Sequence, residues 1–172
     1  MPPILQAVLL LVFPVLVIVA ALRDVTSFTI PNWISGLLIL AFFPAALALG
    51  LSLPQIGLHA AVGAAALVMG VIMFALRWIG GGDAKLFAAA GLWLGWPAVL
   101  PYLVYTAIAG GALALALIGL RSMWMRAFVV GGPAWMGRLA TPGESVPYGV
   151  AIAVGAMAAF PGTALMRAWG GL

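Results

Sequence analysis

The chain has 172 residues, of which 66% are hydrophobic and only 6% are charged. A water-soluble domain carries about 25% charged residues, so this composition excludes a soluble globular protein and predicts an integral membrane protein. The formal net charge of +4 comes from seven scattered basic residues, and in a membrane protein such an excess reports orientation rather than a nucleic-acid partner.

Six apolar segments each approach the roughly 20 residues that cross about 30 Å of hydrocarbon as a helix. They cover residues 4–22, 33–52, 56–76, 84–100, 102–120 and 147–166. The sequence therefore predicts an all-α fold, a polytopic membrane helix bundle of about six transmembrane helices in a single domain over residues 1–172. The longest connection, about 121–146, mixes arginines with aromatic residues, which indicates either a segment on the inner leaflet or a lid over the active site.

The basic residues predict how these spans are oriented. The first span has no basic residues before it and Arg23 after it, which indicates a retained helix rather than a signal peptide. Alternating the later spans places all three acidic residues and six of the seven basic residues on one side: Arg23, Arg77, Lys85, Arg121, Arg126 and Arg138. The positive-inside rule makes that side the cytoplasm and puts the N-terminus outside.

Two aspartates are predicted to lie at the same depth in the membrane. Asp24 ends the first span and Asp83 begins the fourth, so packing these two helices together would let the carboxyl groups face each other across a cavity. Two close carboxyls share a proton, and such a pair can activate water while polarising a carbonyl. Cysteine is absent and His59 is the one histidine, so we expect neither a metal nor a cofactor.

Each aspartate also has a structural interpretation. Asp83 follows Gly82 at the start of a helix, where a carboxylate is a favourable N-cap. Asp24 follows Arg23, and the two could form a solvated pair at a helix end. We nevertheless favour the catalytic pair, because the only two aspartates of the chain fall at one depth, and acidic residues close to hydrocarbon are costly and tend to be functional.

Three glycines precede Asp83. Gly80, Gly81 and Gly82 permit a positive φ and close approach of another backbone, and they would let an extended peptide bind beside Asp83. The alternative is a flexible turn between helices. Lys85 could adjust a neighbouring carboxylate, although we favour an ammonium group that extends to the membrane interface.

Three segments in order, "RDVTSFTIPNW", "GGGDAKLF" and "VPYGVAIA", resemble the type IV prepilin peptidases, in particular the short form that serves Flp/Tad pili. The first family motif places an Asp before Ile-Pro-Asn, matched by Asp24 and residues 30–32. The second is Gly-x-Gly-Asp with a Lys two residues later, matched by Gly80, Gly82, Asp83 and Lys85.

The resemblance implies an aspartic endopeptidase of the bacterial inner membrane with Asp24 and Asp83 as its catalytic pair. Its partner would be a prepilin, whose short basic leader adjoins a hydrophobic helix and is cut at the cytoplasmic face. Longer members of the family carry a cysteine-rich cytoplasmic segment and also methylate the new N-terminus. Because this chain has no cysteine, we expect cleavage only. The sequence does not indicate an oligomeric state.

Two other functions fit part of this pattern. Proteases of the presenilin or signal-peptide-peptidase type share Gly-x-Gly-Asp, but their first Asp follows a tyrosine within a span. A non-catalytic scaffold or small transporter could use the two aspartates structurally, because a fold does not dictate a function. Glu144 could meet the basic residues of a leader electrostatically, although as a solitary acid it is expected to have no specific role. Tyr148 is an interfacial anchor or a neighbour of the site.

Overall fold

The structure is a computed structural model that describes residues 2–122, 129 and 132–170. The described part is helical without strands, which confirms the all-α prediction. Its elements in chain order are α1 (Pro3–Ser27), α2 (Asn32–Ala48), α3 (Leu53–Ala75), α4 (Gly81–Leu120), α6 (Ala134–Leu139), α7 (Tyr148–Ala159), the 3-10 turn η1 (Phe160–Gly162) and α8 (Ala164–Gly170). Trp124, Arg126 and Phe128 of the predicted connection lie outside the described residues.

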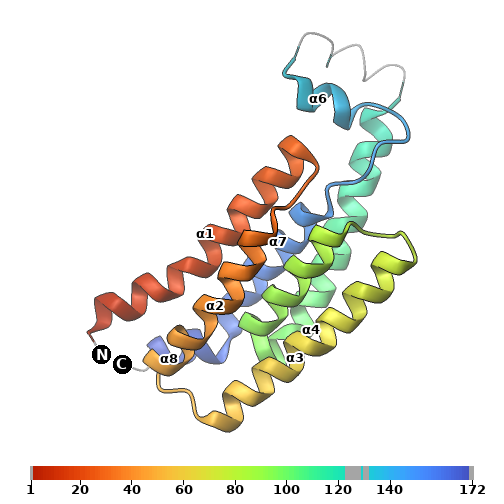
Figure 1. Cartoon of the computed structure of the whole chain (residues 1–172). Coiled ribbons are helices and arrows are strands. Elements are labelled where there is room, and N and C mark those ends of the chain that lie inside the picture. The colour runs from red at the N-terminus through yellow and green to blue at the C-terminus, as the bar shows by residue number, and fades with distance from the viewer. Residues whose placement is uncertain (1, 123–128, 130–131, 171–172) are drawn as a thin grey trace.

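Helix α4 is folded back on itself. Gly95 has a φ of 59° and Trp96 has an extended ψ of 138°, so the helix breaks there. The Tyr102 hydroxyl donates to the Phe87 carbonyl oxygen at 3.3 Å, whereas a straight helix would place two residues so far apart in sequence about 22 Å from each other. Residues 81–94 and 97–120 therefore run antiparallel, as the green and cyan segments show (Figure 1).

This fold corrects two predicted span boundaries. The predicted break between residues 100 and 102 is wrong, because the chain reverses at Gly95, where a left-handed glycine is required. The imidazole of His59 occupies the space that a side chain at Gly95 would need. The last predicted span, residues 147–166, is also broken: η1 ends at the extended Thr163, whose hydroxyl accepts from the Met166 N–H at 3.1 Å and begins α8.

The helices have the length and composition of membrane spans. α1 and α3 are each long and apolar enough to cross a bilayer, α4 contains an apolar stretch of that length, and the bent pair formed by residues 148–162 and α8 would be a further span. α2 is equally apolar but has only 17 residues. The chain is therefore a membrane helix bundle, and the count of six spans stays a prediction.

Aromatic and small side chains hold the bundle together. Phe13, Phe42 and Trp93 are fully buried, and both phenyl rings contact the Trp93 ring, whose indole N–H donates to the Leu38 carbonyl oxygen at 2.8 Å. Gly63 and Gly70 lie directly against the backbone of α4, so α3 packs closely on it.

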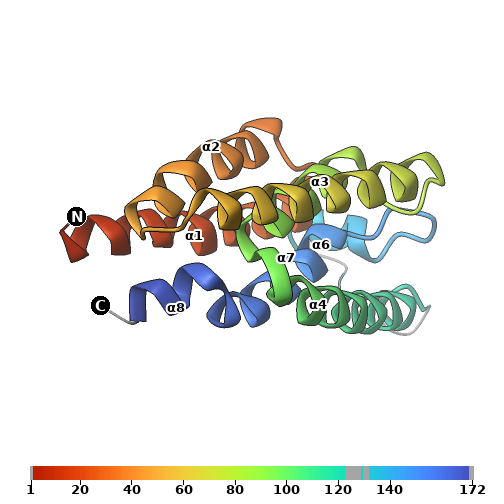
Figure 2. The same cartoon turned by 90° about the horizontal axis from the view of Figure 1, so that it is seen from below.

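One end of the bundle collects the parts of the chain that carry the motifs. The C-terminal ends of α1 and α3, both ends of α4, and α6 lie there, while the N- and C-termini lie together at the opposite end (Figures 1 and 2). The sequence motifs are therefore brought to one end by the alternation of helix direction.

Candidate active site

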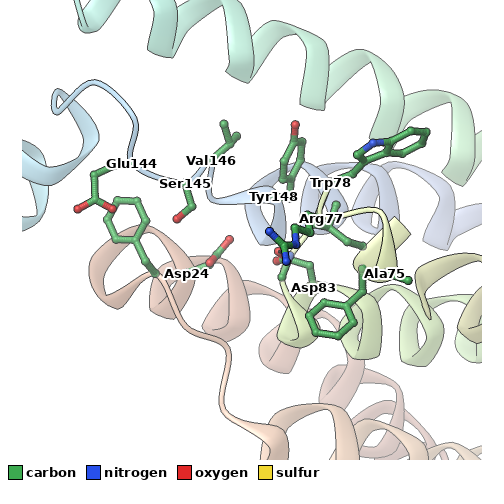
Figure 3. Close-up of a pocket in the computed structure, with 13 residues that line it drawn as sticks. Asp24, Ala75, Arg77, Trp78, Asp83, Glu144, Ser145, Val146 and Tyr148 are labelled. Carbon is green, nitrogen blue, oxygen red and sulfur yellow. Dashed lines mark hydrogen bonds between the residues drawn. The ribbon is translucent and has the colours of Figure 1, made fainter. Parts of the chain in front are cut away.

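A cavity of about 730 Å³ opens at this end of the bundle (Figure 3). Its walls come from the end of α1, the end of α3 with the segment between α3 and α4, and residues 144–146 with Tyr148 at the start of α7. Asp24, Asp83 and Glu144 all line it, and these are the three acidic residues of the chain. The cavity therefore concentrates every carboxylate of an otherwise apolar protein in one place.

Asp24 is held through its side chain, which binds the start of α7, and through its backbone, which lies at the end of α1. Its side chain is only 5% exposed, and one oxygen accepts a hydrogen bond from the Gly149 N–H at 2.7 Å. Helix α1 ends just beyond it, because Phe28 adopts a left-handed conformation and donates its N–H to the Asp24 carbonyl oxygen at 2.8 Å. Asp24 is therefore buried and oriented, and it forms no ion pair with Arg23 in the described structure.

Asp83 caps its helix with only one of its two oxygens. It stands at the third position of α4, where Oδ2 accepts from the Gly80 N–H at 2.9 Å. Its Oδ1 is buried and has no hydrogen-bond partner among the described residues. A structural cap accounts for the first oxygen and leaves the second without a partner among the described residues.

The two carboxyl groups interact with each other. They are close enough for an electrostatic interaction, and the Gly149 N–H that binds Asp24 also lies within interaction range of Asp83. The Gly149 N–H at the start of α7 thus lies between the carboxyl at the end of α1 and the carboxyl at the start of α4. Figure 3 shows both carboxyls in the middle of the cavity, with Glu144 toward one end and Trp78 toward the other.

Of the three glycines before Asp83, Gly82 packs closely against another segment of the chain. A Cβ built on Gly82 would lie 3.0 Å from the Ile30 Cβ and 3.1 Å from the Ile30 carbonyl oxygen, so Gly82 allows the Ile-Pro-Asn segment to approach. The expectation of positive φ here is wrong, because Gly80 has a φ of −73° and no residue from 80 to 82 is left-handed. The left-handed residues at the cavity are instead Phe28 and Arg77.

Gly149 belongs to the third segment of the sequence resemblance but was not predicted as a site residue, and it contacts both other segments. A Cβ built on it would lie 2.8 Å from Asp24 Oδ2 and 2.8 Å from Ile30 Cδ1, closer than real side chains come. Its contribution is a backbone N–H and the absence of a side chain, so no chemical property of the residue drew attention to it. Its place beside Tyr148, whose ring forms part of the cavity wall, was the available indication.

Lys85 contacts neither aspartate. Its ammonium group donates to the Asn32 side-chain oxygen at 2.8 Å and is exposed. Together with the contact between Ile30 and Gly82, this bond joins the start of α2 to the start of α4. The Ile-Pro-Asn and Gly-x-Gly-Asp segments thus form one packed unit around the carboxyls.

The comparisons with known proteins agree with this geometry. The model of the type IV leader peptidase family matches residues 11–115, more than half of the chain, and the match contains both aspartates. The chain belongs to the type IV leader peptidase family. No curated protein and no solved structure gave a match.

Family membership supports a membrane protease that removes the leader peptides of prepilins, as the sequence resemblance predicted. The match ends within α4, before the segment that carries Glu144 and Gly149. The structure places both residues at the site, beyond the end of the matched range.

Proposed function

We propose that this leader peptidase is an aspartic endopeptidase that cuts Flp-type prepilins at the cytoplasmic face of the bacterial inner membrane, with Asp24 and Asp83 as its catalytic pair. The observation that carries the proposal is that Asp24 and Asp83 are both buried, line the same cavity and interact electrostatically. The clustering of basic residues at this end of the bundle supports the cytoplasmic side.

The two carboxyls divide the work of hydrolysis. One is ionised and accepts a proton from a water molecule as the water oxygen attacks the scissile carbonyl carbon. The other is protonated and gives its proton to the carbonyl oxygen, so that a neutral gem-diol intermediate forms. That intermediate collapses when the C–N bond breaks: the leaving nitrogen takes the proton that the first carboxyl accepted from water, and one gem-diol hydroxyl returns a proton to the second carboxyl. The Gly80 and Gly149 N–H groups keep the carboxyls in position throughout.

The geometry also favours cleavage without methylation. Only residues 28–31 connect α1 to α2, which leaves no room there for the cysteine-rich segment of the longer family members. Asp24 lies near the end of its helix rather than in the middle of a span, which favours a cut at the membrane surface over one within the bilayer.

The test is cleavage by the purified protein in detergent. We expect a Flp-type prepilin to be cut once, at the junction of leader and hydrophobic helix, with no methyl group on the new N-terminus by mass spectrometry. Uncut substrate after incubation with folded protein, across a range of prepilins, would contradict the proposal.

Chelators are expected to leave this cleavage unchanged. The described residues contain no group of three His, Cys, Asp or Glu side chains placed to hold a metal ion, and the carboxyl pair activates water without one. Initial rates with and without EDTA are the measurement. Loss of activity that returns with an added divalent cation would refute the metal-free mechanism.

Removing the side chain of Lys85 or of Asn32 is expected to have a small effect on cleavage, and the two effects should not add. Lys85→Ala should lower kcat/KM by less than about tenfold, because its ammonium lies on Asn32 and not on a reacting group. Asn32→Ala should do the same, and the double variant should be no worse than either single one. Additive losses, or a loss from Lys85→Ala as large as that from removing an aspartate, would place the lysine in the chemistry instead.

A further inference from the structure

Glu144 is the third carboxylate of the cavity and has no part in the two-aspartate mechanism. It lines the cavity wall, but unlike the aspartates it stays one-third exposed, with a side-chain exposure of 33%. An ionised carboxylate at such a rim attracts a cation. Its position, partners and charge therefore bear on what the cavity can bind.

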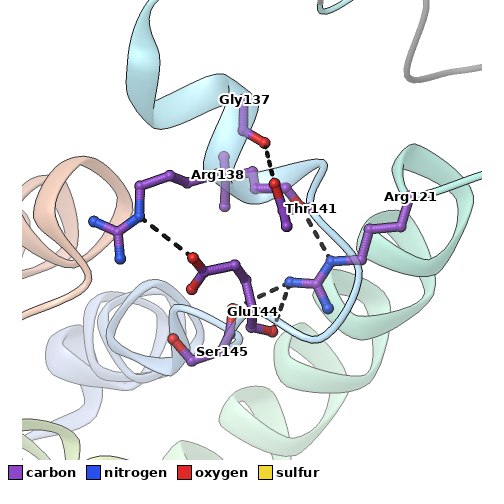
Figure 4. Close-up of polar contacts among 7 residues, drawn as sticks. Arg121, Gly137, Arg138, Thr141, Glu144 and Ser145 are labelled. Atoms are coloured by element: carbon purple, nitrogen blue, oxygen red, sulfur yellow. Dashed lines mark hydrogen bonds and ion pairs between the residues drawn. The ribbon is translucent and has the colours of Figure 1, made fainter.

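The backbone that carries Glu144 is fixed by one guanidinium group. Arg121, at the end of α4, donates to the carbonyl oxygens of Glu144 at 2.9 Å, Ser145 at 3.2 Å and Leu139 at 3.0 Å (Figure 4). Three carbonyls from both sides of the Thr141–Glu144 turn are held this way. The Glu144 carboxylate is consequently presented at a defined place on the rim.

The present partner of Glu144 is easily replaced. Arg138 Nε lies 3.7 Å from a Glu144 oxygen, and the Arg138 side chain is 47% exposed. An exposed ion pair at this distance contributes little to stability. Arg138 has a second contact, because its guanidinium lies 4.4 Å from the centre of the Phe28 ring, and that contact can hold α6 in place when the ion pair opens.

An extended substrate would pass Glu144 on its way across the carboxyl pair. Glu144 lies at one end of the cavity, Trp78 at the other, and Asp24 and Asp83 between them (Figure 3). A peptide bond placed between the aspartates therefore sends one side of the chain toward Glu144. The cavity is lined by the three acidic side chains of the protein and by one cationic side chain, Arg77. Because Arg77 lies beside Asp83 and away from Glu144 (Figure 3), a cationic side chain is the group favoured at the Glu144 end.

We propose that Glu144 is a specificity-determining residue that binds a lysine or arginine side chain of the substrate on one side of the scissile bond, and that this side chain takes the place of Arg138. The proposal rests on the peptidase function proposed above. Arg138 then acts as an internal substitute for the substrate cation and competes with it.

The experiment measures kcat/KM for a prepilin-type peptide with a single lysine near the scissile bond and for the same peptide with glutamine there. The lysine is moved through the positions on both sides of the bond, and the position with the largest Lys/Gln ratio is used. Glu144→Gln should lower that ratio about fivefold, and Glu144→Lys should invert it toward a peptide with glutamate at the same position.

Arg138→Gln is the matched control, because it breaks the same ion pair from the other side. If the pair only stabilises the segment, both variants lower the melting temperature and the rate together. If Arg138 competes with the substrate, Arg138→Gln raises kcat/KM for the lysine peptide about twofold while Glu144→Gln lowers it.

The remaining outcomes distinguish a failure of the role of Glu144 from a failure of the peptidase function on which it rests. A Lys/Gln ratio near one at every position, or a ratio unchanged by Glu144→Gln, overturns the role of Glu144 and leaves the peptidase intact. Failure of the wild-type protein to cut any peptide overturns the peptidase function and, with it, the role of Glu144.

Discussion

Asp83→Asn is expected to lower the rate of leader cleavage by about 10²- to 10⁴-fold or to below detection, with the protein still folded. Asparagine has nearly the same shape and is itself a good capping residue, so its side-chain oxygen can still accept from the Gly80 N–H. It cannot take a proton from water or give one to the carbonyl oxygen. Asp24→Asn should have the same effect, because the two carboxyls act as one unit.

Cleavage is measured by mass spectrometry, and folding by the melting temperature in detergent. The double variant should be no slower than either single variant, since removing one member of a catalytic pair already removes its function. Gln6→Met is a suitable control. It replaces a buried polar side chain at the far end of α1, where Gln6 Nε2 donates to the Ala48 carbonyl oxygen, and it should affect stability rather than rate. Near wild-type turnover in either asparagine variant would defeat the two-aspartate mechanism.

The membrane character of the chain and the proximity of its two aspartates could be predicted because they depend on overall composition and on helix direction. Composition determines the first, and alternation of helix direction brings the ends of α1 and α4 to one side. The position of the fold in α4 could not be predicted in the same way. Pro97 and Pro101 both follow Gly95 within a few residues, and their spacing does not show which of them begins the second arm. The left-handed Gly95 packs against His59, and that contact comes from tertiary packing.

The missed parts of the site share a different cause. Gly149 contributes a backbone N–H, and Glu144 is defined by hydrogen bonds from Arg121 to main-chain carbonyls, so neither depends on a side-chain pattern. Both also lie far along the chain from the residues they serve. Such contacts follow from tertiary packing and leave little trace in the spacing of the sequence.

Ile30 belongs to the Ile-Pro-Asn segment and contacts the two other segments that form the site, the starts of α4 and α7. Its backbone lies against Gly82 and its Cδ1 lies against Gly149, so it separates the start of α4 from the start of α7 by the width of one side chain. That spacing is what lets the Gly149 N–H approach both carboxyls. The Ile-Pro-Asn segment is therefore a spacer that sets the geometry of the pair, and the two glycines are the surfaces on which it rests.

Gly149→Ala is accordingly expected to reduce kcat by about 10²-fold, the loss associated with a displacement of about 1 Å in a catalytic group. The added methyl group would lie 2.8 Å from Asp24 Oδ2 and 3.0 Å from Asp24 Cβ, so the Asp24 carboxyl must move and its hydrogen bond must lengthen. The effect should fall on kcat more than on KM, because the carboxyl pair acts on the transition state rather than on the rest of the substrate.

Gly57→Ala is the matched control for this substitution. Gly57 lies near the start of α3, as Gly149 lies near the start of α7, and a Cβ built on it meets nothing within 4 Å. Alanine favours a helix over glycine, so this variant should be as stable as the wild type and fully active. If Gly149→Ala also kept its kcat, the Asp24 carboxyl would not need the Gly149 N–H for catalysis, and α7 would be a wall of the cavity rather than part of its chemistry.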